Sequence, residues 1–269
     1  MQRLLAHSPG SASLSRDCQW AAQPAVPPSI ADNGSWALAS AEVSPLIDPL
    51  EPEGYDLVVQ RLIPGYASLA RLAVALLAAS PLAAPEGAEV LVAGCGTGAE
   101  LVEAVAQRPD WQLTAIDPSP AMLAAARQRL GEAAPIRWLQ TTAEALTNEQ
   151  GFAGALSVLV LQSLPDDGTK LAFLSALARC LRPGGQLVLV DLMRPALPLL
   201  QEQITEAWLG FQRVSGLELD ADRIAPLTQG LHPIGDARLT ALVNAAGFGD
   251  PARIFQALDY EGFLLQRVA

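Results

Sequence analysis

Several residue types that common functional classes require are scarce in this chain. Lysine occurs once in 269 residues, at Lys170, and histidine twice, at His7 and His232. The 28 acidic side chains outnumber the 17 lysine and arginine side chains, for a formal net charge of −11. Because proteins that bind nucleic acids usually carry a basic face, this balance argues against a nucleic-acid partner and favours a small-molecule substrate. Two histidines also cannot form a metal site of three histidines.

Cysteine and long apolar runs are scarce as well. Cys18, Cys95 and Cys180 lie far apart and form no CxxC pair, so we expect neither a disulfide framework nor a metal centre. No apolar run reaches the roughly 18 residues that cross a bilayer, and the first residues lack the apolar stretch of a secretory signal. We therefore predict a cytoplasmic protein without membrane association, and a homodimer is an open alternative to a monomer.

The first 50 residues differ in composition from the rest. Residues 1–50 are rich in serine, alanine and proline and show no sustained helical or alternating period. We interpret them as a poorly ordered arm or an over-long gene start, with a transit peptide as an alternative, and residues 51–269 as one domain. A helical pattern begins at Pro52, breaks at Pro64-Gly65, and continues in a second helix that begins at about Tyr66.

Strand and helix patterns alternate after Pro85. Strands are predicted at 89–94, 113–117, 136–140, 155–161 and 186–191, and helices at 98–108, 119–130 and 167–181. Strands separated by helices pair in parallel, and the continuous apolar runs of the last two strands indicate a central position. Residues 195–230 and 235–246 are predicted to be helical, and the residues on both sides of Asp259-Tyr260 alternate as a strand pair would.

The sharpest motif is VLVAGCGTGAE (90–100), in which a predicted strand runs through Gly94, Gly96 and Gly98 into a helix. Glycines allow a tight turn and a close approach of a ligand, which the free N–H groups at the helix start would face. The motif therefore favours a cofactor site over an ordinary turn. The loop alone leaves a dinucleotide open, since Ala99 satisfies the last position of G-x-G-x-x-G/A and Asp117 supplies the acid after the second strand.

Four segments together resemble the class I S-adenosylmethionine (SAM)-dependent methyltransferases: GCGTG (94–98), AIDPSPAML (115–123), QTTAEAL (140–146) and LRPGGQLVLVDL (181–192). The resemblance extends from about Tyr55 to the C-terminus, roughly four-fifths of the chain. It implies a three-layer, Rossmann-like α/β fold with a seven-stranded, mostly parallel sheet and a C-terminal antiparallel hairpin. Helices within 52–80 and 195–245 would form a lid that selects the substrate. The implied activity is methyl transfer from SAM to a small molecule.

The resemblance also assigns residues to the cofactor. They are Gly94, Cys95, Gly96 and Gly98 along the methionine part, Asp117 at the ribose, and Pro118, Met122, Thr142 and Ala143 around the adenosine. Three positions that carry acids in the family are Val92, Thr142 and Ala153 here. Each change removes a hydrogen bond worth about 1 kcal/mol rather than the pocket, so we expect cofactor binding to persist and to be weaker.

A narrower resemblance connects the chain to the carboxy-SAM synthases, which make carboxy-S-adenosylmethionine from SAM and prephenate. It rests on RLIPGYASL (61–69), LVLQSL (159–164), FQRVSG (211–216) and the AGF…FQ tail (246–256). It implies that Tyr66 lies over the sulfonium and that Arg213 binds the added carboxylate, a task that suits a guanidinium. Val158 stands at a cofactor-site position where that family has asparagine, which argues against the specialised reaction.

No strong catalytic base is evident in the sequence. Weak candidates are Arg213, His232 and Tyr66, which could equally be a surface charge, a solvated loop histidine and a core aromatic. Three hypotheses follow. The first is methyl transfer to a small molecule, the second is carboxy-SAM synthesis, and the third is a SAM-binding regulatory relative without catalysis, which the missing acids suggest.

Overall fold

A single sheet of seven strands organises the structure. The computed structural model describes residues 52–131, 135–147, 151–194, 198–217 and 230–268, so the predicted arm at 1–50 lies outside it. The strands are β1 Glu89–Ala93, β2 Gln112–Ile116, β3 Ile136–Leu139, β4 Phe152–Val158, β5 Leu181–Leu192, β6 Ala252–Ala257 and β7 Tyr260–Gln266. Their order in the sheet is β3-β2-β1-β4-β5-β7-β6.

Strand direction follows from how the chain connects the strands. The first five strands pair in parallel, mostly through helical crossovers, whereas β7 is antiparallel to both β5 and β6. The predicted mostly parallel sheet with a C-terminal antiparallel hairpin is confirmed. This arrangement also differs from the dinucleotide fold, whose strand order is 3-2-1-4-5-6.

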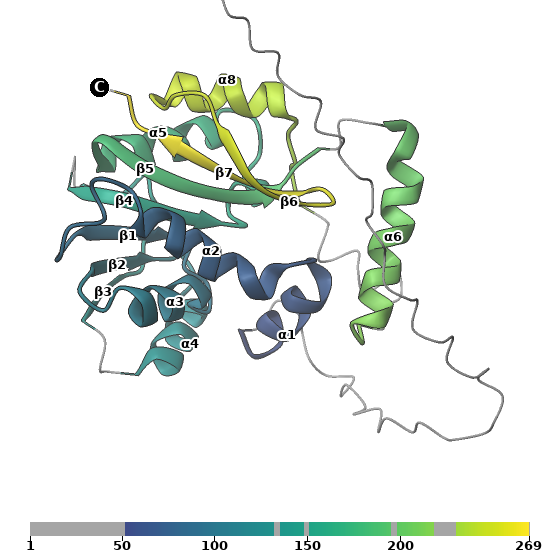
Figure 1. The fold of residues 1–269 in the computed structure, drawn as a ribbon, viewed down its shortest axis with the longest axis horizontal. Helices are drawn as coiled ribbons and strands as arrows, with labels where there is room; N and C mark the ends of the chain where they lie inside the picture. Colours follow the sequence, from purple (N-terminus) through teal and green to yellow (C-terminus); the bar gives the residue numbers. More distant parts are fainter. Residues whose placement is uncertain (1–51, 132–134, 148–150, 195–197, 218–229, 269) are drawn as a thin grey trace, which may run out of the picture. The chain divides into compact units, whose positions relative to one another are not determined.

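Helices cover both faces of the sheet (Figure 1). One face carries α2 (Tyr66–Ala78), α3 (Ala99–Gln107) and α4 (Pro120–Leu130), and the other carries α5 (Thr169–Cys180) and α8 (Asp236–Ala246). Side chains of β1 alternate between the two faces: Val90 and Val92 join one buried apolar cluster, and Leu91 and Ala93 join the other. Burial on both faces explains the continuous apolar runs and confirms the three predicted layers.

Two helices lie beyond the carboxyl ends of the parallel strands, α1 (Pro52–Leu62) and α6 (Gln201–Val214) (Figure 1). Trp208 of α6 donates its indole N–H to the carbonyl of Leu62 at 2.7 Å, and Arg61 donates to the carbonyl of Gly216 at 3.3 Å. A short 3-10 turn, Pro198–Leu200, precedes α6. Of the predicted helical segment 195–230, residues 195–197 and 218–229 lie outside the described residues. That these helices act as a lid stays a prediction.

The fourth strand ends earlier than the sequence predicts. Residues 155–161 are predicted as strand, but β4 spans Phe152–Val158. Leu159 then turns with a φ of +59°, in the left-handed region that residues other than glycine rarely adopt. The apolar run continues past the strand because Val160 and Leu161 pack on the apolar cluster beneath α5. The apolar residues after the turn therefore continue the sequence pattern of the strand, although they lie outside it.

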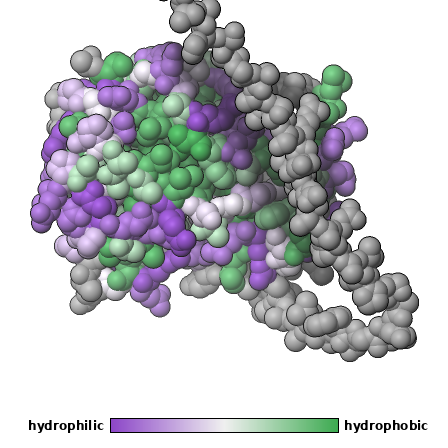
Figure 2. Space-filling view, in the orientation of Figure 1, coloured by the Kyte–Doolittle hydropathy of each residue, from purple (hydrophilic) through white to green (hydrophobic). Residues whose placement is uncertain are grey.

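Apolar side chains gather on the surface over the β6–β7 hairpin (Figure 2). Ile254, Phe255 and Leu264 are half-buried and pack against the cluster that contains α2. Gly65, in the left-handed turn between α1 and α2, approaches Phe255 so closely that a Cβ atom would lie 3.3 Å from its ring.

Among the described helices, none alone is long and apolar enough to cross a bilayer, and α1 with α2 passes that test only as a pair bent by 91°.

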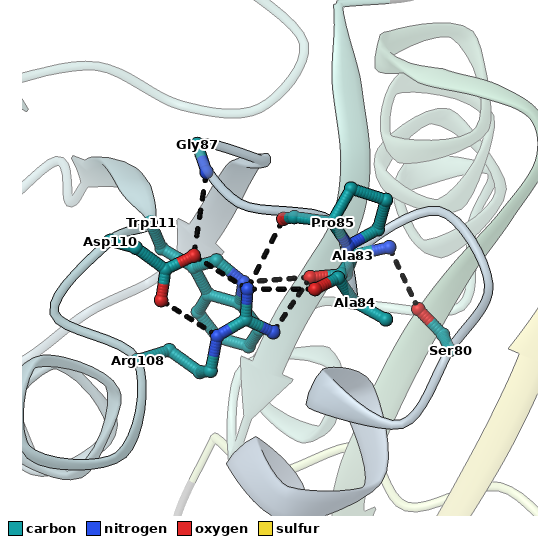
Figure 3. Close-up of polar contacts among 8 residues, drawn as sticks. All are labelled: Ser80, Ala83, Ala84, Pro85, Gly87, Arg108, Asp110 and Trp111. Carbon is teal, nitrogen blue, oxygen red and sulfur yellow. Dashed lines mark hydrogen bonds and ion pairs between the residues drawn. The ribbon is translucent and has the colours of Figure 1, made fainter.

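The connection from α2 to β1 is held by one arginine (Figure 3). Arg108 donates to the carbonyls of residues 83–85 at 3.0–3.1 Å and pairs with both carboxylate oxygens of Asp110 at 2.6 and 2.8 Å. Its guanidinium lies 5.1 Å from the ring centre of Trp111, whose indole N–H donates to the carbonyl of Ala83. These contacts fix the end of the sheet opposite the glycine loop.

We expect Arg108→Ala to lower the free energy of unfolding by about 2–3 kcal/mol, because it leaves carbonyls and a carboxylate without their charged donor. Urea denaturation measures the loss. Arg71→Ala is the matched control: Arg71 is 70% exposed and pairs with Glu103 at 3.4 Å, so its loss should cost less than about 0.5 kcal/mol. Equal losses in the two variants would contradict the anchoring role of Arg108.

Candidate functional site

The glycine loop between β1 and α3 is closed by backbone hydrogen bonds. The N–H groups of Gly94 and Cys95 both donate to the carbonyl of Ile116, at 2.9 and 3.0 Å, which holds the loop against the end of β2. Gly98 donates to the carbonyl of Cys95 at 2.8 Å and precedes the first residue of α3. The glycine loop predicted from the sequence therefore forms as expected, and it leads directly into the first turn of α3.

The three glycines of the loop serve different purposes. A Cβ atom on Gly94 would lie 2.3 Å from the Val160 side chain, and one on Gly98 would lie 3.1 Å from Leu130. These two glycines are required by packing within the protein. A Cβ atom on Gly96, whose φ is +49°, would meet nothing within 4 Å. The backbone at Gly96 is thus open on the side where a ligand can approach, which fits a cofactor bound along this loop.

Asp117 joins the glycine loop to the start of α4. One of its oxygens accepts from the N–H of Gly96 at 2.9 Å, and the other accepts from the N–H of Ser119 at 2.8 Å. Ser119 in turn caps α4 by accepting from the N–H of Met122. A carboxylate has about four acceptor positions, so Asp117 keeps capacity for further donors such as a pair of hydroxyl groups. The site therefore fits the ribose of a nucleoside cofactor.

The residues expected around the adenine come together at the ends of β2 and β3. The side chain of Gln140, directly after β3, donates to the carbonyl of Pro118 at 3.5 Å. Met122 is half-buried, Ala143 is buried and Thr142 is exposed. Cys95, expected at the methionine part, is also buried, and burial raises the pKa of its thiol to about 12. This thiol is therefore a packing group and not a nucleophile.

Asp56, which the sequence interpretation missed, ties α1 to the site. It accepts from the hydroxyl of Thr97 in the glycine loop at 2.6 Å and pairs with Arg129 of α4 at 2.7 Å. Thr97 and Arg129 are 41 and 73 positions from Asp56 in the sequence, so no local pattern signals these contacts. The bridge positions α1 beside the loop.

A buried acid and three tyrosines lie next to this bridge. All three tyrosines of the chain are covered: Tyr66 and Tyr260 are buried in the apolar cluster, and Tyr55 packs against it. Burial raises the pKa of the Tyr66 hydroxyl, and the Glu100 carboxylate raises it further. Glu100, in the first turn of α3, is only 6% exposed, and burial raises its pKa to about 7. The sequence gives no sign that Glu100 is buried, because its burial depends on the packing of α2 against α3.

The remaining candidate residues, Val158, His232 and Arg213, lie on separate elements. Val158 is half-buried at the end of β4, and the exposed His232 donates its backbone N–H to the carbonyl of Gln162 at 2.6 Å. Arg213 is exposed in the last turn of α6, whereas the neighbouring Gln212 is buried. The structure therefore brings His232 to the segment after β4 but gives no contact between Arg213 and the glycine loop. No cluster of metal-ligating side chains occurs among the residues described.

We expect Glu100→Gln to stabilise the ligand-free protein in a pH-dependent way. Because the folded protein binds the Glu100 proton more tightly than the unfolded chain, the wild type loses stability as the pH rises from about 4.5 to about 7. The advantage of the variant should be small at pH 4.5 and reach as much as about 3 kcal/mol above pH 7. Melting temperatures measured across this range test the expectation, and a difference that does not change with pH would contradict it.

Comparison with known proteins agrees with this geometry. Residues 90–185 match the methyltransferase domain family. The chain is 30% identical over 212 residues to the carboxy-S-adenosyl-L-methionine synthase of Chromohalobacter salexigens, covering 76% of each protein. It is 40% identical over 115 residues to the trans-aconitate 2-methyltransferase of Methylobacterium nodulans, covering 43% of this chain and 42% of that protein.

A solved structure of another protein has the same fold. It is the Burkholderia thailandensis 1,6-didemethyltoxoflavin-N1-methyltransferase with bound 1,6-didemethyltoxoflavin and S-adenosylhomocysteine, which is 21% identical. The two structures superpose with a TM-score of 0.55 over 81% of this chain and 83% of that one. With the sheet order, the open glycine loop and the Asp117 bridge, these matches show that the chain belongs to the class I SAM-dependent methyltransferases.

Proposed function

We propose that this methyltransferase binds SAM along Gly96 and Asp117 and transfers its methyl group to a small-molecule acceptor. The observation that carries the proposal is the Gly96 backbone, which is open toward a ligand while Asp117 holds its N–H. SAM supplies an electrophilic methyl group on a sulfonium. A net charge of −11 supports a small acceptor, because the field of the protein repels polyanions. The cytoplasmic location and the homodimer stay predictions.

Each part of the site has a role in this proposal. Asp117 uses its remaining acceptor capacity for the ribose hydroxyls, and the turn from Gly94 to Gly98 lies along the methionine part. Pro118, Met122, Thr142 and Ala143 flank the adenine. The acceptor then lies at the carboxyl ends of the strands, where ligands bind in open α/β sheets. Tyr66 and α1 exclude water there, so that methyl transfer is driven by proximity and desolvation.

Glu100 supports recognition of the amino group of SAM. Val92 lacks the acid that relatives carry at the end of β1, and it is buried in the apolar cluster. Glu100 is a buried carboxylate seven residues past that strand, and its charge acts on both Cys95 and Tyr66. An ammonium group placed beside a buried carboxylate stabilises its charged form, which burial disfavours. We assign it to the cofactor's ammonium.

Replacement of Asp117 tests the cofactor site. We expect Asp117→Ala to weaken SAM binding by about 1.5–3 kcal/mol, because it removes a charged acceptor for the ribose hydroxyls. Isothermal titration calorimetry gives both dissociation constants. Asp250→Ala is the control: it removes the same charge at the far edge of the sheet, where Asp250 accepts from Asn244 at 3.0 Å. An unchanged dissociation constant for Asp117→Ala would refute the assignment.

A second candidate function is carboxy-SAM synthesis. The observation that favours it is the coverage of the relatives named carboxy-SAM synthases, which match 76–78% of this chain at 29–30% identity. In addition, the guanidinium of Arg213 is exposed at the end of α6 and has no partner among the described residues. Val158 in place of asparagine opposes this candidate.

Arg213 separates the two candidates. If the pocket accepts carboxy-SAM, Arg213→Ala should cost about 2–4 kcal/mol in carboxy-SAM affinity and leave SAM affinity unchanged, since only one ligand carries the partner charge. Titration of both ligands into wild type and variant measures this. A wild type without preference for carboxy-SAM removes the synthase candidate, and an effect on the acceptor KM alone places Arg213 at the acceptor.

A further inference from the structure

The chain makes a strained turn directly after β4. Leu159 has a φ of +59°, and its N–H donates to the carbonyl of Val190 at 2.7 Å. Residues 161–163 then form a single 3-10 turn. Backbone strain of this kind persists only where the surroundings over-determine the conformation, and it is frequent at functional sites. The turn moves the chain onto the carboxyl end of the neighbouring strand β5.

Gln162, in this turn, is fixed at three points. Its backbone N–H donates to the Asp191 carboxylate at 2.9 Å, and its carbonyl accepts from the N–H of His232 at 2.6 Å. Its side-chain Oε1 accepts from the N–H of Leu192 at 2.9 Å. The backbone is thus held from two sides, and the side chain is held at the last residue of β5.

Two buried titratable groups, Asp191 and Lys170, contact the same turn. Asp191 is 2% exposed, and Lys170 is 1% exposed with its ammonium donating to the carbonyl of Leu161. Burying polar groups costs free energy unless they are hydrogen-bonded. The Lys170 ammonium and one Asp191 oxygen are bonded to residues 161–162, whereas the other Asp191 oxygen has no partner among the described residues, and burial raises the pKa of Asp191 to about 8. Their common effect is to hold Gln162 in place, as second-layer residues do for a preorganised site.

The nitrogen of the Gln162 side-chain amide makes no hydrogen bond with the described residues. Because Oε1 accepts from Leu192, the other end of the amide is the Nε2 group, which offers two N–H donors. Nε2 has no hydrogen-bond partner in the part of the chain that the structure describes, and the residue is half-exposed. It lies between the carboxyl ends of β4 and β5, on the ligand-binding edge of the sheet.

We propose that Gln162 recognises the methyl acceptor, by donating from Nε2 to a carboxylate oxygen. The inference rests on the proposed function and deepens it, because it names small carboxylic acids as the acceptor class. A fixed amide donor selects an oxygen acceptor and rejects a cationic amine, which would place donor against donor. A site built for such a hydrogen bond discriminates strongly, since a wrong ligand leaves its polar groups unpaired.

The test measures binding of two carboxylate probes, trans-aconitate and prephenate, to protein saturated with S-adenosylhomocysteine, which cannot react. Gln162→Glu keeps an oxygen for the N–H of Leu192 but replaces both donors with a second oxygen. We expect at least a tenfold rise in the dissociation constant of the bound carboxylate and less than a twofold change for S-adenosylhomocysteine. Gln256→Glu is the control, because Gln256 is exposed on β6 and its side-chain amide donates to the carbonyl of Leu258.

The possible outcomes separate this inference from the proposed function. A wild type that binds S-adenosylhomocysteine but neither carboxylate overturns the role of Gln162 and leaves the cofactor site intact. A wild type that fails to bind S-adenosylhomocysteine overturns the proposed function itself. If Gln162→Glu does not fold, Gln162→Met removes the donors without adding charge and should weaken carboxylate binding in the same direction. Parallel losses for carboxylate and S-adenosylhomocysteine would make Gln162 a structural residue only and refute the inference.

Discussion

The bridge that Asp117 makes between two backbone N–H groups is the constraint on which the site depends. Its two oxygens hold Gly96 and Ser119, so one carboxylate fixes both the glycine loop and the first turn of α4. The loop can stay open at Gly96 because its other glycines are packed and its N–H groups are bonded to the end of β2. The same carboxylate is the acceptor for the ribose in our proposal, so cofactor binding and loop shape are coupled.

The walls of the site are held by polar contacts between elements far apart in the sequence. Asp56 links α1 to the glycine loop and to α4, while Lys170 and Asp191 hold the turn that carries Gln162. Glu100 is buried as well, in the helix against which α2 packs. Buried polar groups of this kind stabilise one arrangement only when each is bonded. These contacts therefore fix the shape of the pocket more than they add to the stability of the fold.

The resemblances to class I methyltransferases and to carboxy-SAM synthases concern different parts of the molecule. The sheet, the glycine loop and Asp117 are common to class I SAM-dependent methyltransferases, and they make no choice of acceptor. In our proposal the choice of acceptor depends on the turn after β4, which carries Gln162 and contacts His232, and on the helices beyond the sheet, which carry Arg213. In that same region Val158 departs from the pattern of the carboxy-SAM synthases, whereas Arg213 agrees with it.

The sequence by itself determined the sheet, its parallel strands, the C-terminal hairpin and the place of the glycine loop with Asp117. These features depend on periodicity and on short spacings, which a chain carries locally. Tertiary structure alone decided where β4 ends, because the apolar run from Val158 to Leu161 packs against the apolar clusters both in the strand and after it. It also decided that Glu100 is buried, that Asp56 meets Thr97, and that Gln212 turns inward while Arg213 faces solvent. Such depth and pairing arise from contacts between distant elements, and no local pattern encodes them.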